Sequence, residues 1–310
     1  MSNSVLISSI ATAVGGGTAI LLVACGELIV ERSGVYNIGI EGVMLCGALA
    51  GFLGANATGS WVTGLIIAAL FGMVASTLYG VVTVLMRADQ VVAGVAMVLA
   101  VAGVTSIVGQ GHVSEEAASR IPDWHVPLLS AIPGVGPALF EQSIMAYVAF
   151  ALPFVLWFAL ERTRRGLQLT SIGENPDAAD AAGLSVVGWR LSSLAIGGAL
   201  TGIGGGVLTL GIVGSWQDNV TAGQGWIGFA IVFFAAWRPF GLLVGAYLFG
   251  ALATLGNVGQ AEGWTIPSQV FVALPYVGTV AMMVARSLVT RRQGGGSPWP
   301  AALGFPFYRS

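Results

Sequence analysis

Long apolar stretches alternate with short polar segments along almost the whole chain, which indicates a series of membrane-spanning helices. A helix needs about 20 mostly apolar residues to cross the hydrocarbon layer of a bilayer. The segment from Thr221 to Gly228 is glycine-rich and the apolar stretch after it is short, so we expect a broken or re-entrant helix there. Nine spans are predicted, at residues 5–30, 37–55, 61–86, 90–110, 143–161, 191–213, 226–237, 240–258 and 268–289.

The composition supports an all-α, polytopic membrane fold. The chain has 310 residues, of which 55% are hydrophobic and 8% are charged, whereas soluble domains carry about 25% charged residues. So few charges would not cover the surface of a soluble protein of this size. We therefore predict one transmembrane domain over residues 1–293. Residues 294–310 contain runs of glycine and proline and are predicted to form a loose cytoplasmic tail.

The arginines predict the orientation of the chain. With nine spans and an outside N-terminus, Arg120 is the one basic residue of 12 that falls outside. This bias follows the positive-inside rule and places the C-terminus inside. The acidic loop 111–142 then lies outside, where its prolines suggest a cap or a short lateral helix.

The inner loop, residues 162–190, contains signals for a short helix. Asn175 is a suitable N-cap, Pro176 a suitable first residue, and Gly183 a suitable stop. The alanine-rich helix predicted over 174–183 would have little to bury against itself. We therefore expect it to pack on another protein.

Polar groups inside a membrane are costly and tend to mark transport pathways. Asn37 and Glu41 lie four residues apart at the start of the second span, so on one helix they share a face. Glu41 fits a polar contact in a central cavity and an interfacial cap equally well. An interfacial cap with an internal Glu–Arg pair is favoured for Glu31 and Arg32.

Other polar positions leave two interpretations open. Asp89 fits the N-terminus of the fourth span, and Gln90 fits a cavity contact or an interfacial position. A cluster around residues 216–226 would stack on and hydrogen-bond a planar ligand, or form the aromatic belt at the outer interface. The residues predicted to line a substrate pathway are Asn37, Glu41, Gln90, Trp216, Gln217, Asn219, Gln224 and Trp226.

Several kinds of chemistry are excluded or disfavoured. The chain has no lysine, which removes a Walker A phosphate loop and lysine Schiff-base chemistry. Cys25 and Cys46 lie in apolar segments and are interpreted as packing residues, and no group of residues has metal-ligand spacing. Gly198, Gly202 and Gly206 are predicted to form a small-residue ridge for helix packing. No catalytic residue, metal site or cofactor of this chain is predicted.

Four segments resemble the permeases of nucleoside-type ABC importers, a branch of the group that also imports ribose-like sugars and branched-chain amino acids. They are ERSGVYNIGIEGVMLCGA (31–48), ADQVVAGVAM (88–97), SIGENPDAADAAGLSV (171–186) and GQGWIGFAIVFFAAWRPFG (223–241). They occur in the family's order and cover most of the chain. One departure is that the family commonly has an arginine near residue 224, where this chain has Gln224.

The resemblance implies a pore-forming subunit of the bacterial inner membrane that carries no enzymatic activity. Its partners would be an ATPase subunit that binds ATP and Mg, a second paralogous permease, an extracytoplasmic substrate-binding lipoprotein and a small-molecule substrate, with no nucleic acid. The helix at 174–183 would be the coupling helix. The implied ATPase-docking residues are Glu174, Asn175, Pro176, Asp177, Asp180 and Gly183.

The substrate implied first is a nucleoside, and a furanose or other simple sugar second. An ion-coupled secondary transporter is a further alternative, with Glu41 and Asp218 as proton sites. Such carriers are often built from inverted repeats, and no convincing repeat is visible. A membrane enzyme is disfavoured because no set of nucleophile, base and orienting residue is visible.

Overall fold

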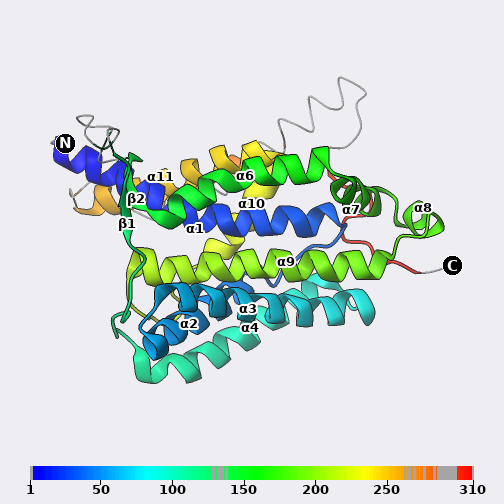
Figure 1. The fold of residues 1–310 in the computed structure, drawn as a ribbon, viewed down its shortest axis with the longest axis horizontal. Coiled ribbons are helices and arrows are strands. Elements are labelled where there is room, and N and C mark those ends of the chain that lie inside the picture. Colours follow the sequence, from blue (N-terminus) through cyan, green and yellow to red (C-terminus); the bar gives the residue numbers. More distant parts are fainter. Residues whose placement is uncertain are drawn as a thin grey trace.

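Long helices lie side by side along one axis of the protein (Figure 1). The computed structural model describes residues 3–127, 130, 136, 139–261 and 299–308, with isolated positions between 263 and 284. Within these residues, seven helices are long and apolar enough to cross a membrane. The main helices are α1 (Asn3–Arg32), α2 (Ile40–Thr58), α3 (Trp61–Gly80), α4 (Gln90–Gly109), α6 (Ile144–Arg162), α9 (Val186–Val207), α10 (Gln224–Ala235) and α11 (Pro239–Ala261).

The helices match the first eight predicted stretches to within a few residues. Two of them continue as short π-helices, α3 over Val81–Leu85 and α9 over Leu208–Val213. α10 has 12 residues, which corresponds to about 18 Å and is too short for a bilayer of about 30 Å. The prediction of a short helix here is confirmed. The ninth predicted span, 268–289, lies largely outside the described residues, so the total of nine stays a prediction.

The predicted outer loop contains a short β-ribbon as well as irregular segments. After a single 3₁₀ turn at Gln110–His112, the chain forms β1 (Asp123–His125), which pairs antiparallel with β2 (Glu141–Ser143). This two-stranded ribbon lies at the end of the bundle that also holds the N-terminus (Figure 1). The expectation of a purely α-helical chain is therefore wrong in this loop.

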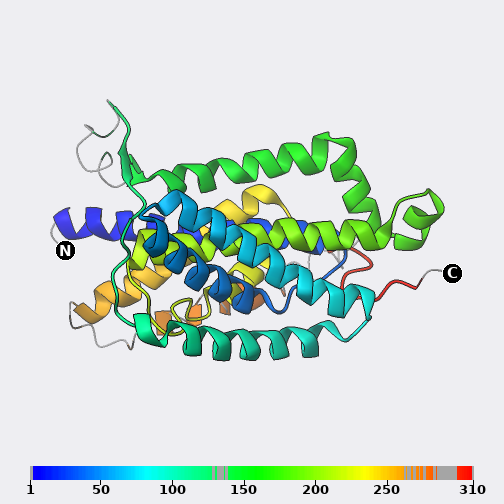
Figure 2. The ribbon, with the colours of Figure 1, turned by 60° about the horizontal axis from the view of Figure 1, so that its bottom comes forward.

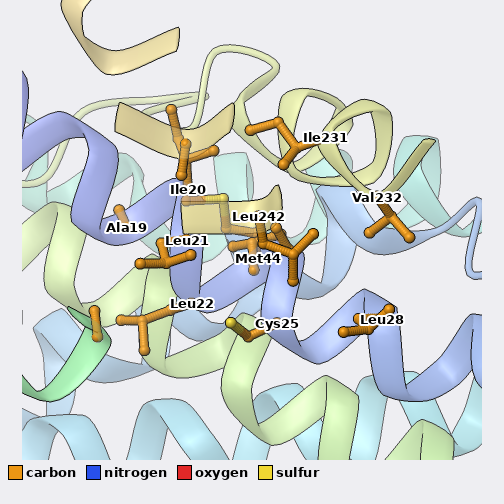
Figure 3. Close-up of a cluster of buried hydrophobic side chains, with 14 of the residues drawn as sticks. Ala19, Ile20, Leu21, Leu22, Cys25, Leu28, Met44, Ile231, Val232 and Leu242 are labelled. Atoms are coloured by element: carbon orange, nitrogen blue, oxygen red, sulfur yellow. The ribbon is translucent and has the colours of Figure 1, made fainter. Parts of the chain in front are cut away.

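Helices α1 and α9 lie at the centre of the bundle. α4 and α6 lie on opposite outer edges, as Figure 2 shows. The largest buried cluster is built around α1 and joins it to α2, α10 and α11. Figure 3 shows Met44, Ile231 and Leu242 gathered around the apolar residues of α1. This core positions α10, the short helix, against the interior side of α1.

Glycines bring α2, α3 and α9 into close contact, as the predicted small-residue ridge required. A Cβ atom on Gly72 of α3 would lie 2.7 Å from the Cα of Gly202 of α9. A Cβ on Gly47 of α2 would overlap the backbone of Gly202 as well. Backbones at this separation gain dispersion contacts in place of the hydrophobic effect, which is weak between helices in lipid. The ridge prediction for α9 is confirmed.

The predicted inner loop contains two helices, and only the second of them was predicted from the sequence. α7 (Arg164–Glu174) is capped by the Thr163 hydroxyl and was not predicted, whereas α8 (Pro176–Ala181) was. Leu169 and Ile172 bury one face of α7. In Figures 1 and 2, α8 projects beyond the ends of the other helices.

The C-terminal segment differs from its prediction. Residues 299–308 pack beside α7 and α9 and do not form a loose tail. The Ala302 amide donates to the Gly173 carbonyl (2.8 Å), and Ala302 and Leu303 are buried. The expectation of a loose tail is therefore wrong for these ten positions. Residues 294–298, 309 and 310 lie outside the described residues.

Candidate substrate pathway and docking face

The chain is broken between α9 and α10. The π-helical turn after α9 ends at Gly214, which has a φ of 73°, and α10 begins after Gly223, which has a φ of 87°. The residues between them are not helical. In a membrane, irregular backbone is tolerated only where protein or a water-filled cavity covers it. This break is therefore a candidate wall of a substrate pathway.

Glu41 holds the beginning of α10. Its carboxylate accepts hydrogen bonds from the Thr221 hydroxyl (2.6 Å) and from the backbone amides of Gly223 (2.9 Å) and Gly225 (2.7 Å). All three neighbours donate, which suits an acceptor-only carboxylate. Free amides and a positive dipole end make a helix N-terminus a favourable place for an anion. Glu41, which is 5% exposed, therefore fixes α10 from a neighbouring helix.

Glu31 and Arg32 hold the other end of α10. The chain turns at Ala236 and Trp237, both with positive φ. The Trp237 indole donates to Glu31 Oε2 (2.6 Å), and Arg32 Nη2 donates to the Trp237 carbonyl (2.7 Å). A cation beside helix C-terminal carbonyls is stabilising. Among the described residues Glu31 and Arg32 form no ion pair with each other, so the predicted internal pair is replaced by bonds to α10.

Asn37 lies in the turn between α1 and α2 and not on α2, which begins at Ile40. The predicted shared helix face with Glu41 is therefore wrong. The Asn37 backbone amide donates to Glu27 Oε1 (3.0 Å). Its side chain is 1% exposed, and neither amide atom has a hydrogen-bond partner among the residues described. Leaving such groups unsatisfied costs about 1–3 kcal/mol each, so a hydrogen bond from a ligand or water that reached this buried amide would be favourable.

Gln90 positions the same turn. Its Oε1 accepts from the Tyr36 amide (2.8 Å), and the one proton of the Tyr79 hydroxyl is shared between the carbonyls of Tyr36 (2.7 Å) and Gln90 (3.0 Å). Gln90 is buried at the first residue of α4. Its side-chain oxygen is therefore used within the protein, and its predicted role in the pathway becomes one of positioning Tyr36.

A row of aromatic rings follows one side of α10. Phe229, Phe233 and Trp237 succeed one another at four-residue spacing, with ring centroids 5.2 and 5.0 Å apart. Tyr36 stacks on Phe233 at 6.2 Å and also meets Phe229 at 6.0 Å. Tyr36, Phe229 and Phe233 are half-buried. The row places ring faces beside the turn that contains Asn37.

The predicted cluster at 216–226 is divided by the fold. Trp216 is fully buried and packs on Phe52 (6.5 Å) within an apolar cluster between α2 and the break. Gln217 and Asn219 are exposed, while Gln224 and Trp226 are half-buried at the start of α10. Trp216 is thus a packing residue in this structure. The two exposed amides and the two half-buried residues keep their predicted role in the pathway as a prediction.

The helix predicted to dock a partner has the predicted ends. The Asn175 side chain caps Ala178 (3.0 Å), Pro176 is the first residue, and Gly183 has a φ of 86°. Ala179 is buried against α7 and α9. The remaining surface of this hairpin faces away from the bundle. Its exposed residues are Glu174, Asn175, Asp177, Ala178, Ala181, Ala182 and Gly183, and Pro176 and Asp180 are half-buried.

A groove of about 380 Å³ opens beside α8. It lies between the end of the π-helical turn after α3 and the beginning of α9. Arg87 and Asp180 supply charge to its wall, and Phe307 of the C-terminal segment closes one side. The α8 end of the protein therefore combines a projecting helix with a recess.

Most arginines described lie at the α8 end. α1 and α6 end at Arg32 and Arg162, and Arg190 lies in the second turn of α9, which begins there. Arg87 and Arg238 lie on connections at the same end, and Arg164 and Arg165 are the first two residues of α7 there. Arg120 lies at the opposite end, where it donates to the Gly214 carbonyl (3.3 Å). The grouping predicted from the sequence holds for the described arginines.

Glu27 and the aromatic row were not predicted from the sequence as parts of the site. Glu27 is 1% exposed within the apolar α1, so an ionisable residue inside a predicted span was a usable signal. Phe229 and Phe233 gave no signal, because phenylalanines in an apolar helix look like lipid-facing residues until their neighbours are known.

Comparison with known proteins identifies the relatives of the chain. The family model described as branched-chain amino acid transport system / permease component matches residues 9–285. No solved structure matches.

Three relatives align over most of the chain. A protein of Lactococcus lactis named as a nucleoside ABC transporter permease is 33% identical and covers 89% of this chain and 92% of its own length. A guanosine ABC transporter permease of Bacillus subtilis is 31% identical over 94% of this chain and 93% of its own. A putative glucose ABC transporter permease of Haloferax volcanii is 38% identical over 78% of this chain and 74% of its own.

Proposed function

This chain belongs to the family of branched-chain amino acid transport system permease components, and from this premise we propose that it is the pore-forming permease of an ATP-driven importer for nucleosides. Two relatives named for nucleoside or guanosine transport align over nearly their whole lengths. The structural observation that carries the substrate class is the half-buried row of Tyr36, Phe229 and Phe233, together with the buried, unpartnered amide of Asn37, the residue that follows Tyr36. A base offers a flat face to stack and edges to hydrogen-bond.

The two ends of the bundle are assigned opposite partners in this proposal. The α8 end, rich in arginine, faces the cytoplasm by the positive-inside rule and receives the ATPase, which binds ATP and Mg. The ribbon end, with the exposed acidic residues Glu115, Glu116 and Asp123, faces outward and receives the substrate-binding lipoprotein. A second, paralogous permease completes the pore in the bacterial inner membrane.

α10 is the element that the proposal expects to move. It is short and follows a break, and it is held at its two ends by side chains of α1 and α2. ATP binding to the partner would favour one of two arrangements of these contacts, and hydrolysis the other, because a ligand shifts an equilibrium by its difference in affinity for the two states. The permease itself carries out no chemistry.

A sugar is the second candidate substrate. The observation that favours it is the relative named for glucose, whose aligned part is 38% identical. Both candidates predict ATP-dependent uptake and differ in the ligand. An ion-coupled transporter would differ from both in its energy source.

The test is uptake into proteoliposomes that contain the permease with its co-encoded partner permease, ATPase and lipoprotein. We expect ATP-dependent uptake of radiolabelled guanosine or uridine, unaffected by a proton uncoupler. Uptake of ribose or glucose in place of the nucleosides would move the assignment to sugars. Uptake that survives without ATP and stops with the uncoupler would refute the importer assignment.

Docking on α8 is tested by Ala181→Arg. Ala181 is exposed in the last turn of α8, where a cation is compatible with the helix dipole, so the helix is retained while its docking face becomes bulky. We expect loss of ATPase co-purification. Ala57→Arg is the matched control, because Ala57 is exposed in the last turn of α2 at the other end of the bundle. Equal ATPase recovery from both variants would contradict docking at α8.

A further inference from the structure

Residues 299–308 connect elements that are far apart in the sequence, and neither the substrate pathway nor the docking helix accounts for them. On one side they hold the α7–α8 hairpin. The Ala302 amide donates to the Gly173 carbonyl (2.8 Å), and the Ala301 amide donates to Glu174 Oε2 (3.3 Å). Phe307 packs on the small apolar cluster that includes Ala179 of α8. The segment therefore holds the end of α7 and packs on the cluster in which α8 is anchored.

On the other side the same residues hold the turn between α1 and α2. The Gly304 amide donates to the Gly34 carbonyl (3.1 Å). Gly304 has a φ of 83°, and a Cβ atom there would lie 2.8 Å from the Tyr36 ring. The ring thus lies against the segment with no room for a side chain between them. Leu303 is buried and belongs to the main apolar cluster around α1.

Arg190 joins the segment to this turn from α9. Its Nη1 donates to the Phe305 carbonyl (3.0 Å) and its Nε to the Ser33 carbonyl (3.3 Å). The residue is 2% exposed. Hydrogen bonds from a charged donor are stronger than neutral ones, so one guanidinium ties residues 305 and 33 to the same point. Four chain segments therefore meet within a few residues: the turn after α1, the end of α7, the start of α9 and the C-terminal segment.

We propose that residues 299–308 are a strap that transmits displacement of α8 to the α1–α2 turn and through Tyr36 to α10, so that it couples ATP hydrolysis to transport. The proposal rests on the proposed function. Tyr36 is the transmitting side chain, because one part of its ring faces Gly304 while its ring stacks on Phe233 of α10 at 6.2 Å.

The strap is separable from docking. Gly173 of α7 packs directly on the Arg32 carbonyl, a contact that does not involve the strap. The Asn175 side chain caps α8 by accepting from the Ala178 amide, within the hairpin itself. Without the strap, α7 and α8 are therefore expected to keep their local structure and the ATPase to keep its docking site. What is lost is the connection from α8 to Tyr36.

The experiment uses the full complex in proteoliposomes and measures guanosine uptake and ATP hydrolysis in the same vesicles. Three variants weaken the strap: truncation that removes residues 299–310, Phe307→Ala and Gly304→Ala. Gly59→Ala is the matched control, since Gly59 also has a positive φ of 67° but no atom within 4 Å of an added Cβ. Both glycine variants place an alanine at a positive φ, and Gly304→Ala alone also brings its Cβ against Tyr36.

A second readout needs no transported ligand. Ala222 is exposed in the break before α10, so a cysteine introduced there by Ala222→Cys reports the movement of this segment as a change in maleimide labelling on trapping with ATP and vanadate. The native cysteines, Cys25 and Cys46, are buried and half-buried, which keeps the background low. This readout is applied in the wild-type and in each strap variant.

We expect the strap variants to retain ATPase co-purification and basal hydrolysis, to lose at least roughly five-fold in uptake per ATP, and to lose the ATP-dependent change in labelling at residue 222. Gly59→Ala should behave as wild type. Unchanged coupling and labelling in Gly304→Ala and Phe307→Ala would overturn the strap, as would loss of ATPase co-purification, which would make the segment part of the docking site. If the truncated protein does not accumulate, the two point variants decide.

Failure of the proposed function is distinguishable from failure of the strap. Wild-type vesicles that show neither ATPase association nor an ATP-dependent change at residue 222 would refute the importer assignment, and with it the strap. Wild-type vesicles that show both, with strap variants identical to them, would refute the strap alone.

Discussion

The hydrogen bonds of Glu41 predict a large effect of a small substitution. Glu41→Gln retains the shape of the side chain and one oxygen, which would continue to accept from Thr221 and Gly223. The amide nitrogen would then face the Gly225 amide, which now donates to Glu41 Oε2 at 2.7 Å. An accepted bond is thereby replaced by two opposed donors at a site where Glu41 is 5% exposed.

The magnitude follows from the number of bonds. A hydrogen bond to a charged group contributes about 1.5–3 kcal/mol, and leaving a buried donor unsatisfied costs a similar amount. Glu41→Gln loses one such bond, so we expect the attachment of α10 to weaken by about 1.5–3 kcal/mol, which is about a 10- to 150-fold shift between attached and detached states. Glu41→Ala loses three bonds and should be worse. Thr221→Val removes only the hydroxyl bond to the same carboxylate and leaves no opposed donor, so it should cost least, near the lower end of that range at about 1.5 kcal/mol.

Two measurements check this order. Melting temperature of the detergent-purified complex reports the attachment, and initial uptake rate reports its consequence for transport. We expect both to fall in the order Thr221→Val, Glu41→Gln, Glu41→Ala. Glu41→Gln that matches wild type in both would show that the bonds to the start of α10 do not hold it, and the role assigned to Glu41 would be withdrawn.

Two further predictions concern packing and the other end of α10. Gly202→Leu would place a side chain against the Ala68 carbonyl and Gly72. We expect this overpacking to cost at least about 1–3 kcal/mol and to reduce the folded protein seen in size-exclusion profiles. Gly103→Leu, at an exposed position of α4 with open space around it, should be tolerated, and equal yields of the two variants would contradict the close packing assigned to Gly202. Trp237→Phe removes the donor to Glu31 and should lower the melting temperature by the equivalent of about 1–3 kcal/mol; an unchanged melting temperature would show that the indole bond is not needed.

Local signals were enough to find α8 and the glycine ridge. The Asn175 cap, the proline after it and the positive φ of Gly183 are all set within nine residues of chain. Glycines at four-residue spacing on α9 predict one close-packing face without any knowledge of the partner helix. α7 was missed because it is short and its composition is polar, although Leu169 and Ile172, three residues apart, were a local signal for an apolar face.

Long-range contacts decided the roles of the charged residues. Glu41 and Glu31 bond to groups 180 and more residues away along the chain, and no local pattern names such partners. From the sequence, Glu41 fitted a contact in a cavity and an interfacial cap equally well. In the fold its carboxylate caps the start of a different helix, α10. Trp216 likewise fitted a ligand site or a membrane interface, and packing on Phe52 placed it in the interior.

What the sequence by itself determined is the membrane-embedded helical architecture, the grouping of arginines at one end and the short helix α8, because these depend on apolar length, charge position and local capping. Only the tertiary structure decided how α10 is held, that Asn37 stands off α2 with its amide unpartnered, and that residues 299–308 bind back onto the bundle. Those features depend on which distant segments meet. That is fixed by the packing of α1, α2 and α9, and a row of apolar residues along one helix carries no record of its neighbours.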